Sequence, residues 1–358
     1  MPKKVIITNA GRLHFNSLKM NAEGGRGCGG IGVALDGPAM KIVFSPAKKI
    51  IISGGDDYLK NKIKGFAENI LKYLNTDQGV NIKILNYFPH QVGLGSGTQL
   101  GLSIGQGISV LYNKKISPRK IAEITRRGGV SGIGYYSFLK GGLIVDGGYR
   151  IGKDEVKKTF ADHNLTPPPL TGQYKFPNEW KIILLTPKKT LPKISSIDEG
   201  KFFVKNTPIP LEEVGTICTN VLMGMIPALQ EKNYFKFMDY LSLISNIGTK
   251  KIELELNKEN FNHFNNALNY LLANKLVRKK ASKYDWPLKN FNRLEDKYPK
   301  DKIPFLALSS LGPTFYSILL EGYHDLDFIM NNLKRSLPAD WTACLTTVRN
   351  KAAKIEIS

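Results

Sequence analysis

Glycines at alternate positions mark one stretch of this sequence as a place where the backbone can hold a phosphate. Gly93, Gly95 and Gly97 stand in the run PHQVGLGSGTQLGL, just before residues with helical spacing. Glycine adopts positive φ angles and lets a ligand approach the backbone closely. The free N–H groups and the dipole at a helix start attract anions, and Ser96 and Thr98 add hydroxyl donors. The stretch therefore predicts a phosphate-binding loop, with an ordinary turn as the alternative.

The elements on both sides of this loop strengthen the prediction. Residues 81–88 read as a strand, and apolar residues then recur at helical spacing at Leu100, Ile104, Ile108 and Leu111. A strand, a glycine-rich loop and a helix follow in that order. The spacing is neither that of a P-loop, since no Gly-Lys-Ser/Thr follows, nor that of the dinucleotide fingerprint G-x-G-x-x-G.

Short alternating segments separated by glycines open the chain and predict strands. These segments are residues 5–8, 13–15, 31–35, 42–44 and 50–53. A helix is expected after Asp56 or Asp57, because either side chain caps a helix well, and another after Pro118, which suits a first turn. Residues 143–145 read as a short buried strand.

A proline-rich stretch, residues 165–187, predicts the connection between two α+β domains, at 1–175 and 176–358. In the second domain, residues 180–186 and 305–308 are expected as strands. Helices are expected at 214–229, 237–247, 257–272 and 325–337. The first of these helices is apolar enough to be either core or a dimer surface.

The composition limits the classes of function. The chain has 358 residues and a formal charge of +21, but its lysines are spread in short clusters without a basic arm or a helix-turn-helix pattern. We therefore expect a basic pocket for a polyanionic small molecule, not a nucleic-acid partner. No apolar run is long enough to span a membrane, and the three cysteines form no zinc or disulfide pattern. A cytoplasmic enzyme is the expectation.

Three motifs resemble those of the GHMP kinases. PHQVGLGSGT resembles their phosphate loop, P-x3-G-L-x-S-S-A, while GRLHF at 11–15 resembles the first motif and ALSSLGPTFYS at 307–317 the third. The motifs occur in the expected order over most of the chain. The resemblance implies a two-domain α+β fold, with an N-terminal domain like ribosomal protein S5 and a ferredoxin-like C-terminal domain.

One replacement argues against a kinase. The GHMP kinases carry a catalytic acid in a segment P-S-G-x-D, and the corresponding segment here is RRGGVSGIGYYS, with Gly134 at the position of the aspartate. Glycine cannot accept the proton of an alcohol. Gly97 also replaces the second serine of the loop. A divergent kinase would need an acid elsewhere, such as Asp146, and a non-catalytic nucleotide-binding protein is the third alternative.

Longer strings are similar to the 4-(β-D-ribofuranosyl)aminobenzene 5′-phosphate synthase family of methanopterin biosynthesis. They are GGIGVAL, GLGSGTQL, RGGVSGIG, GGLIVDGG, CTNVLMGMIPAL and LSSLGPT. This resemblance implies an enzyme that couples phosphoribosyl pyrophosphate to 4-aminobenzoate and releases pyrophosphate and carbon dioxide. Related C-glycoside synthases of C-nucleoside antibiotic pathways share these motifs, so a heteroaromatic acid is the alternative acceptor.

Two segments depart from the family pattern. Asp146-Gly147-Gly148 is followed by Tyr149 where the family has histidine, and LPKISSIDEGKFF lacks the usual glycine-rich form, although Glu199 and Phe202–Phe203 remain. Both segments leave the acceptor open.

The resemblance implies a donor site that holds the pyrophosphate-bearing side of phosphoribosyl pyrophosphate. The expected residues are Gly93, Leu94, Gly95, Ser96, Gly97, Thr98, Gln99, Ser309, Ser310, Gly312 and Thr314. Arg126 and Arg127 are expected to neutralise a phosphate, and Ser131 and Gly132 to extend the anion site. A helix cap at Ser309 and Ser310, and a solvated helix end at the arginines, are the alternatives.

Three residues are expected to be catalytic. Arg12 and His14 alternate on one strand and so share a face, which suits contact with the acceptor carboxylate. Asp146 ends a short strand and is expected as a general base, a ribose contact or a Mg²⁺ ligand; a turn cap is its alternative. The family resemblance also implies a homodimer.

Overall fold

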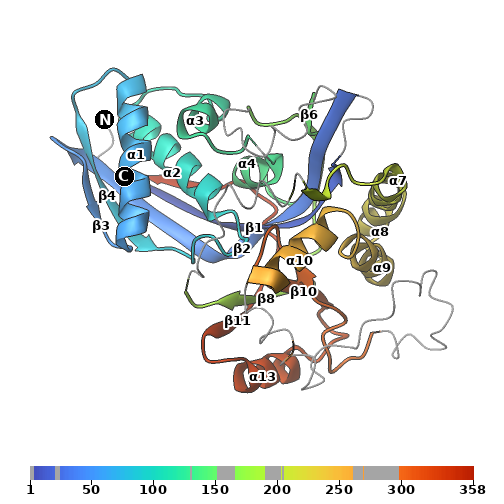
Figure 1. Cartoon of the computed structure of the whole chain (residues 1–358). Coiled ribbons are helices and arrows are strands. Elements are labelled where there is room, and N and C mark those ends of the chain that lie inside the picture. Colours follow the sequence, from blue (N-terminus) through green and yellow to red (C-terminus); the bar gives the residue numbers. More distant parts are fainter. Residues whose placement is uncertain are drawn as a thin grey trace.

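The computed structural model has two β-sheets with helices around them, which is the mixed α+β class expected from the sequence (Figure 1). Among the described residues, one sheet has eight strands and the other has four. The structure describes residues 4–20, 25–129, 131–150, 166–189, 203, 205–260, 269 and 298–358.

Two long antiparallel strands form the centre of the first sheet. β1 (Val5–Lys19) and β2 (Arg26–Ala47) pair over most of their lengths. Four of the short strands expected here are therefore parts of two continuous strands, and the prediction of glycine turns between them is wrong. Register shifts after Ala10 and after His14 absorb the irregularity, because a β-bulge bends a strand without ending it.

The remaining strands of this sheet flank β1 and β2. β4 (Gly79–Asn86) and β5 (Leu143–Asp146) both pair with β2. The sheet is completed by β3 (Ile51–Ser53), β6 (Tyr149–Arg150), β7 (Leu170–Tyr174) and β12 (Lys354–Ile357). β12 pairs with β1, so the end of the chain returns to the first sheet.

Four helices cover one face of this sheet (Figure 1). They are α1 (Asp57–Tyr73), α2 (Ser96–Leu111), α3 (Pro118–Thr125) and α4 (Gly132–Leu139). The Asp56 side chain caps α1 by accepting a 2.8 Å hydrogen bond from the N–H of Leu59, as the sequence predicts. A Cβ at Gly107 would lie 2.4 Å from the Phe44 ring, so this glycine lets α2 pack directly on β2.

The second sheet packs one face in a core of its own and the other in the main core. Its strands are β8 (Trp180–Pro187), β9 (Ala307–Leu308), β10 (Phe315–Leu320) and β11 (Trp341–Thr346), with α13 (Leu326–Ser336) packed nearby. Ile183, Leu185, Phe315 and Leu333 are buried together. The chain changes sheet between β7 and β8, beside the domain boundary predicted at residue 175.

A group of helices packs between β8 and the far end of β1. They are α7 (Leu211–Thr219), the π-helix η2 (Asn220–Met225), α8 (Ile226–Gln230), α9 (Tyr234–Ile244) and α10 (Thr249–Asn260). The single helix expected at 214–229 is interrupted by η2 next to Pro227, which has no N–H to donate. Most of the helix expected at 257–272 lies outside the described residues. Across the described part of the chain, no helix is long and apolar enough to cross a membrane.

Candidate active site

The glycine loop connects β4 to α2 and presents the start of that helix. Gly95 is the N-cap of α2, with a left-handed φ of 73° and no side-chain cap. Gly93 also has a positive φ, and a Cβ there would lie 2.3 Å from the carbonyl oxygen of Ser309. Glycine is therefore required at both positions, by conformation and by space. An uncapped helix start of this length presents free N–H groups that favour an anion.

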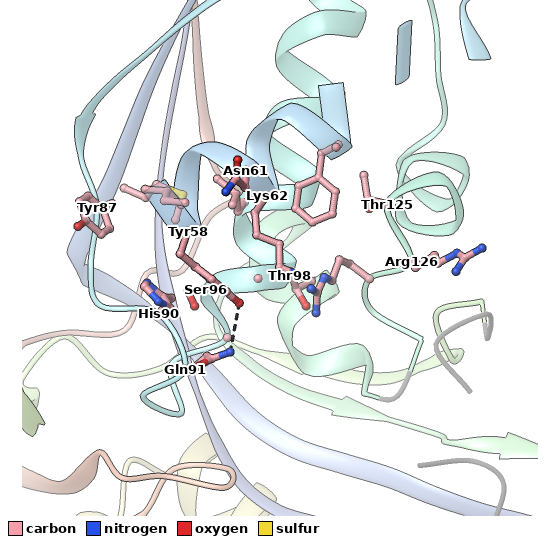
Figure 2. Close-up of a pocket in the computed structure, with 18 of the residues that line it drawn as sticks. Tyr58, Asn61, Lys62, Tyr87, His90, Gln91, Ser96, Thr98, Thr125 and Arg126 are labelled. Carbon is pink, nitrogen blue, oxygen red and sulfur yellow. Dashed lines mark hydrogen bonds between the residues drawn. The ribbon is translucent and has the colours of Figure 1, made fainter. Parts of the chain in front are cut away.

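A pocket of about 1310 Å³ opens in front of this loop. Figure 2 shows Ser96 and Thr98 below side chains of α1, with Arg126 at one side. Five cations line the pocket, and among its described lining residues there is no aspartate or glutamate. The cations are Arg12, Lys62, Lys72, Arg126 and Arg127. Unopposed positive charge around a helix start favours a ligand with several negative charges.

Arg127 lies directly against the loop. A Cβ at Gly97 would lie 3.2 Å from its Cζ, and the guanidinium is 5.8 Å from the centre of the Phe66 ring on α1. Burial lowers the pKa of Arg127, but an arginine stays charged at neutral pH. Gly97, which replaces a serine of the kinase motif, thus makes room for a cation. Arg126 is exposed at the end of α3.

Arg12 joins the first strand to the loop. Its Nη1 donates a 2.5 Å hydrogen bond to the carbonyl oxygen of Gly93, and its own N–H donates to Leu94. Burial lowers the pKa of Arg12 to about 10, while the nearby charge of Glu253 raises it. The side chain lines the pocket as a cation.

The second glycine turn lies behind the loop and supports it. Ser309 Oγ donates to the carbonyl oxygen of Gly93 at 2.8 Å, and the N–H groups of Ser310 and Thr314 donate to His14 and Val92. Ser309, Ser310, Gly312 and Thr314 are expected from the sequence to contact phosphoribosyl pyrophosphate. None of them is among the residues that line the pocket. The hydroxyls of Ser309 and Thr314 and the N–H groups of Ser310 and Gly312 have partners within the protein, so this turn acts as a buttress for the loop.

His14 and Asp146 both approach the same glycine, Gly30. His14 Nε2 and Asp146 Oδ2 lie 3.0 and 3.3 Å from the position that a Cβ would take at Gly30. Asp146 Oδ2 accepts a 3.0 Å hydrogen bond from the N–H of Gly132, and its Oδ1 accepts one of 3.1 Å from Gly148. The three strands β1, β2 and β5 lie side by side here, which brings together residues far apart in the sequence.

The environment of this pair alters its proton affinity. Burial raises the pKa of Asp146 to about 7, and the two amide hydrogen bonds oppose that shift. Burial and the charges of Lys250 and Arg12 lower the pKa of His14 well below its ordinary range. At neutral pH the histidine is therefore neutral, and Asp146 exchanges a proton near pH 7.

The residues at the start of α4 hold Asp146 and lie outside the pocket lining. Ser131 caps α4 by accepting from the N–H of Ile133, and the N–H of Gly132 donates to Asp146.

Two expected loop residues are buried beneath the pocket lining. Gln99 Nε2 donates a 2.7 Å hydrogen bond to the carbonyl oxygen of Gly134, and Leu94 is in the core. A Cβ at Gly134 would lie 3.3 Å from Thr98. The position of the missing kinase acid is therefore beside the loop.

A buried ion pair lies on α10. It was not among the residues expected from the sequence. Lys250 Nζ donates to Glu253 Oε2, and the exposed fractions of the two side chains are 0% and 6%. Lys250 Nζ also lies 3.5 Å from the carbonyl oxygen of Ser310. Thr249, Lys250, Glu253 and Asn257 are all buried, and their spacing places them on one helix face. Such a polar stripe usually marks a solvated face, so these residues carry no clear signal of a buried pair.

Of the two segments that depart from the family pattern, the structure describes Tyr149 and Phe203. Tyr149 is partly buried, with its hydroxyl 3.5 Å from the carbonyl oxygen of Gly128, and burial followed by the charge of Asp146 raises its pKa. Phe203 lines the pocket. Glu199 and Phe202 lie outside the described residues.

The described residues do not form a dedicated metal centre. No group of three or more histidine, cysteine, aspartate or glutamate side chains gathers in the described part of the chain. Each oxygen of Asp146 already accepts an amide hydrogen bond. The expectation that Asp146 binds Mg²⁺ stays a prediction.

Comparison with known proteins first defines the class. Residues 61–142 match the GHMP kinases N terminal domain. Homoserine kinase from Cytophaga hutchinsonii aligns with a TM-score of 0.55 at 15% identity, over 99% of this chain and 98% of that one. Mevalonate diphosphate decarboxylase from Enterococcus faecalis aligns with a TM-score of 0.60 at 11% identity, over the whole of both chains. The protein has the GHMP fold, as predicted.

Sequence relatives then give the family. Beta-ribofuranosylphenol 5′-phosphate synthase of Methanocaldococcus jannaschii is 38% identical over 269 residues, which cover 71% of this chain and 81% of that protein. The synthase of the same name from Archaeoglobus fulgidus is 34% identical, over 68% of this chain and 76% of that protein. The chain belongs to this family of synthases. The C-glycoside synthase function expected from the sequence is confirmed at this level, and the kinase alternative is not favoured.

Proposed function

We propose that the protein joins the anomeric carbon of phosphoribosyl pyrophosphate to the ring carbon of an aromatic acid that bears the carboxylate. The relatives' name describes a ribosylated phenol, so 4-hydroxybenzoate is the first acceptor to test, ahead of 4-aminobenzoate and heteroaromatic acids. The single observation that carries the proposal is a pocket with a helix start, five cations and no carboxylate among its described lining residues. Such a pocket stabilises a departing pyrophosphate.

The bond changes balance without an added reactant. The C–O bond to pyrophosphate breaks and the oxygen keeps the electron pair. The ring carbon that carries the carboxylate donates a pair to the anomeric carbon. The bond to the carboxylate then breaks, its electrons restore the aromatic ring, and carbon dioxide leaves. The protein must therefore stabilise a growing negative charge on the leaving group and hold two substrates in line.

On the donor side, the start of α2, Arg127 and Arg12 are proposed to hold the pyrophosphate. Ser96, Gly97 and Thr98 of the first turn line the pocket, and both guanidinium groups lie against the loop. Charge-assisted hydrogen bonds in a partly buried site become stronger as the charge grows on the leaving oxygen.

On the acceptor side, Arg12 is proposed to contact the acceptor carboxylate as well as the pyrophosphate, so that it lies between the two substrates. His14 with Asp146 is proposed to hold the proton of the para hydroxyl. Arg12 and His14 are two residues apart on one face of β1, a separation of about 7 Å, which suits a para-substituted ring. Removing the hydroxyl proton makes the opposite ring carbon more nucleophilic. Asp146 is suited to this task because its pKa lies near 7.

Magnesium, a homodimer and a cytoplasmic location stay predictions. Because the described residues form no dedicated metal site, any Mg²⁺ is expected to bind through donor phosphates, and no step above depends on it.

The test supplies phosphoribosyl pyrophosphate with 4-hydroxybenzoate, 4-aminobenzoate or a heteroaromatic acid and measures pyrophosphate release. Release that depends on the aromatic acid, and that is fastest with 4-hydroxybenzoate, supports the proposal. ATP hydrolysis that depends on a small alcohol contradicts it.

A further inference from the structure

One face of α1 lines the pocket opposite the glycine loop. Tyr58, Lys62, Gly65, Asn69 and Lys72 all border the pocket, and their spacing of four and three residues places them on one side of a helix. The opposite face of the helix carries buried apolar residues.

Lys62 lies above the start of α2. Tyr58, one turn earlier, contacts the loop, since Gln91 Nε2 donates a 3.1 Å hydrogen bond to its hydroxyl. Phe66, one turn later, packs against Arg127, which lies over Gly97. Lys62 is between these two contacts, and Figure 2 shows it above Thr98.

Aromatic stacking fixes the position of this cation. The Tyr58 ring stacks on His90, with centroids 4.1 Å apart and planes inclined by 12°. Lys62 Nζ is 5.8 Å from the centroid of the same Tyr58 ring, within the range of a cation–π contact. A chain of contacts therefore runs from His90 through the Tyr58 ring to the Lys62 ammonium group.

We propose that Lys62 binds the pyrophosphate group from the α1 side, as the third cation with Arg12 and Arg127, and that Tyr58 positions it. This inference rests on the proposed function, because it assigns the loop to the pyrophosphate of the donor. In this arrangement the amides at the start of α2, Arg12 of β1 and Arg127 just after α3 contact the pyrophosphate. Lys62 contacts it from α1.

The test measures binding of inorganic pyrophosphate and of ribose 5-phosphate to the whole protein by calorimetry. Lys62→Met is expected to weaken pyrophosphate binding about 10- to 100-fold, the effect of losing one charge-assisted hydrogen bond, and to leave ribose 5-phosphate binding unchanged. Lys62→Arg is expected to retain most of the affinity. The matched control is Lys64→Met, since Lys64 is on the exposed face of the same helix, 3.9 Å from Glu68.

Tyr58→Leu is expected to weaken pyrophosphate binding, but to have no further effect in a protein that already carries Lys62→Met, because a positioning residue acts only through Lys62. Equal pyrophosphate affinity in Lys62→Met and Lys64→Met would overturn the assignment while the proposed function stands. A wild-type protein that binds neither pyrophosphate nor ribose 5-phosphate would overturn both.

Discussion

Nη1 of Arg12 donates a hydrogen bond of 2.5 Å to the carbonyl oxygen of Gly93. This contact joins the first strand of the chain to the loop in front of α2, and Ser309 Oγ donates to the same carbonyl from behind. The loop is therefore held from two sides before a ligand binds. A site fixed in this way loses little entropy when the donor is bound.

Arg12→Lys is expected to lower kcat/KM at least 100-fold while the protein stays folded. The planar guanidinium of arginine can donate to the loop with one N–H group and to a ligand with another. Lysine keeps the charge but lacks this geometry. The measurement is pyrophosphate release under saturating acceptor, together with a thermal melt. Arg335→Lys, at an exposed position of α13, is the control. Near-normal turnover in Arg12→Lys would remove Arg12 from the site.

Activity is expected to rise with pH through about 7, because Asp146 must lose its proton to act as a base. Burial raises its pKa to about 7 from an ordinary value of 3.8. The ionisable groups around it are Cys28, Tyr136, Tyr149 and His14. Asp146→Asn is expected to lose most activity and the dependence on pH. An unchanged pH profile in Asp146→Asn would contradict this role.

The same carboxyl group affects stability in the opposite direction. Its pKa is higher in the folded protein than in the unfolded chain, so the folded state holds the proton more tightly between pH 3.8 and about 7. The stability that this group contributes is fully present below that window and is lost as the pH rises through it. Melting temperatures at pH 5 and pH 8 are expected to differ more for the wild-type protein than for Asp146→Asn.

Gly30→Ala is expected to lower kcat strongly and stability by about 1–3 kcal/mol. The new Cβ would lie 3.0 Å from His14 Nε2 and 3.3 Å from Asp146 Oδ2, so it would separate the two groups. Gly215→Ala on α7 is the control, because its Cβ would meet nothing within 4 Å, and it is expected to leave activity intact. Equal activity in both variants would show that the His14–Asp146 pair is not catalytic.

Lys250→Met and Glu253→Gln are each expected to destabilise the protein by about 3–5 kcal/mol, because each leaves a buried charge without its partner. Burial lowers the pKa of Lys250 and raises that of Glu253, and the partner's charge opposes each shift. The double variant Lys250→Met/Glu253→Met is expected to recover part of the loss. Lys258→Ala, which removes an exposed pair with Glu255 on the same helix, is expected to cost less than about 1 kcal/mol. Denaturant melts that rank the variants otherwise would contradict the buried pair.

The sequence predicts the parts of the fold that depend on local patterns. The cap at Asp56, the helix after Pro118 and the glycine loop before α2 follow from side-chain chemistry within a few residues. The two long strands are missed because bulges and glycines inside β1 and β2 have the same local appearance as turns. Whether a strand continues is decided by its pairing partner, which the local sequence does not contain.

The candidate site is predicted in part for the same reason. The glycine loop, Arg12 and Arg127 carry distinct motifs, and all of them line the pocket. The buttress position of Ser309 and Ser310 depends on which strand their loop packs against. Lys62 and Lys250 resemble many other lysines of a basic chain, and only the fold shows that one lines the pocket and the other is buried.

The most direct test of the central claim is the stoichiometry of products from phosphoribosyl pyrophosphate and carboxyl-labelled 4-hydroxybenzoate. The account predicts one pyrophosphate and one labelled carbon dioxide for each ribosylated ring, with no requirement for ATP. Pyrophosphate release without loss of the label, or a product phosphorylated at the expense of ATP, would contradict it.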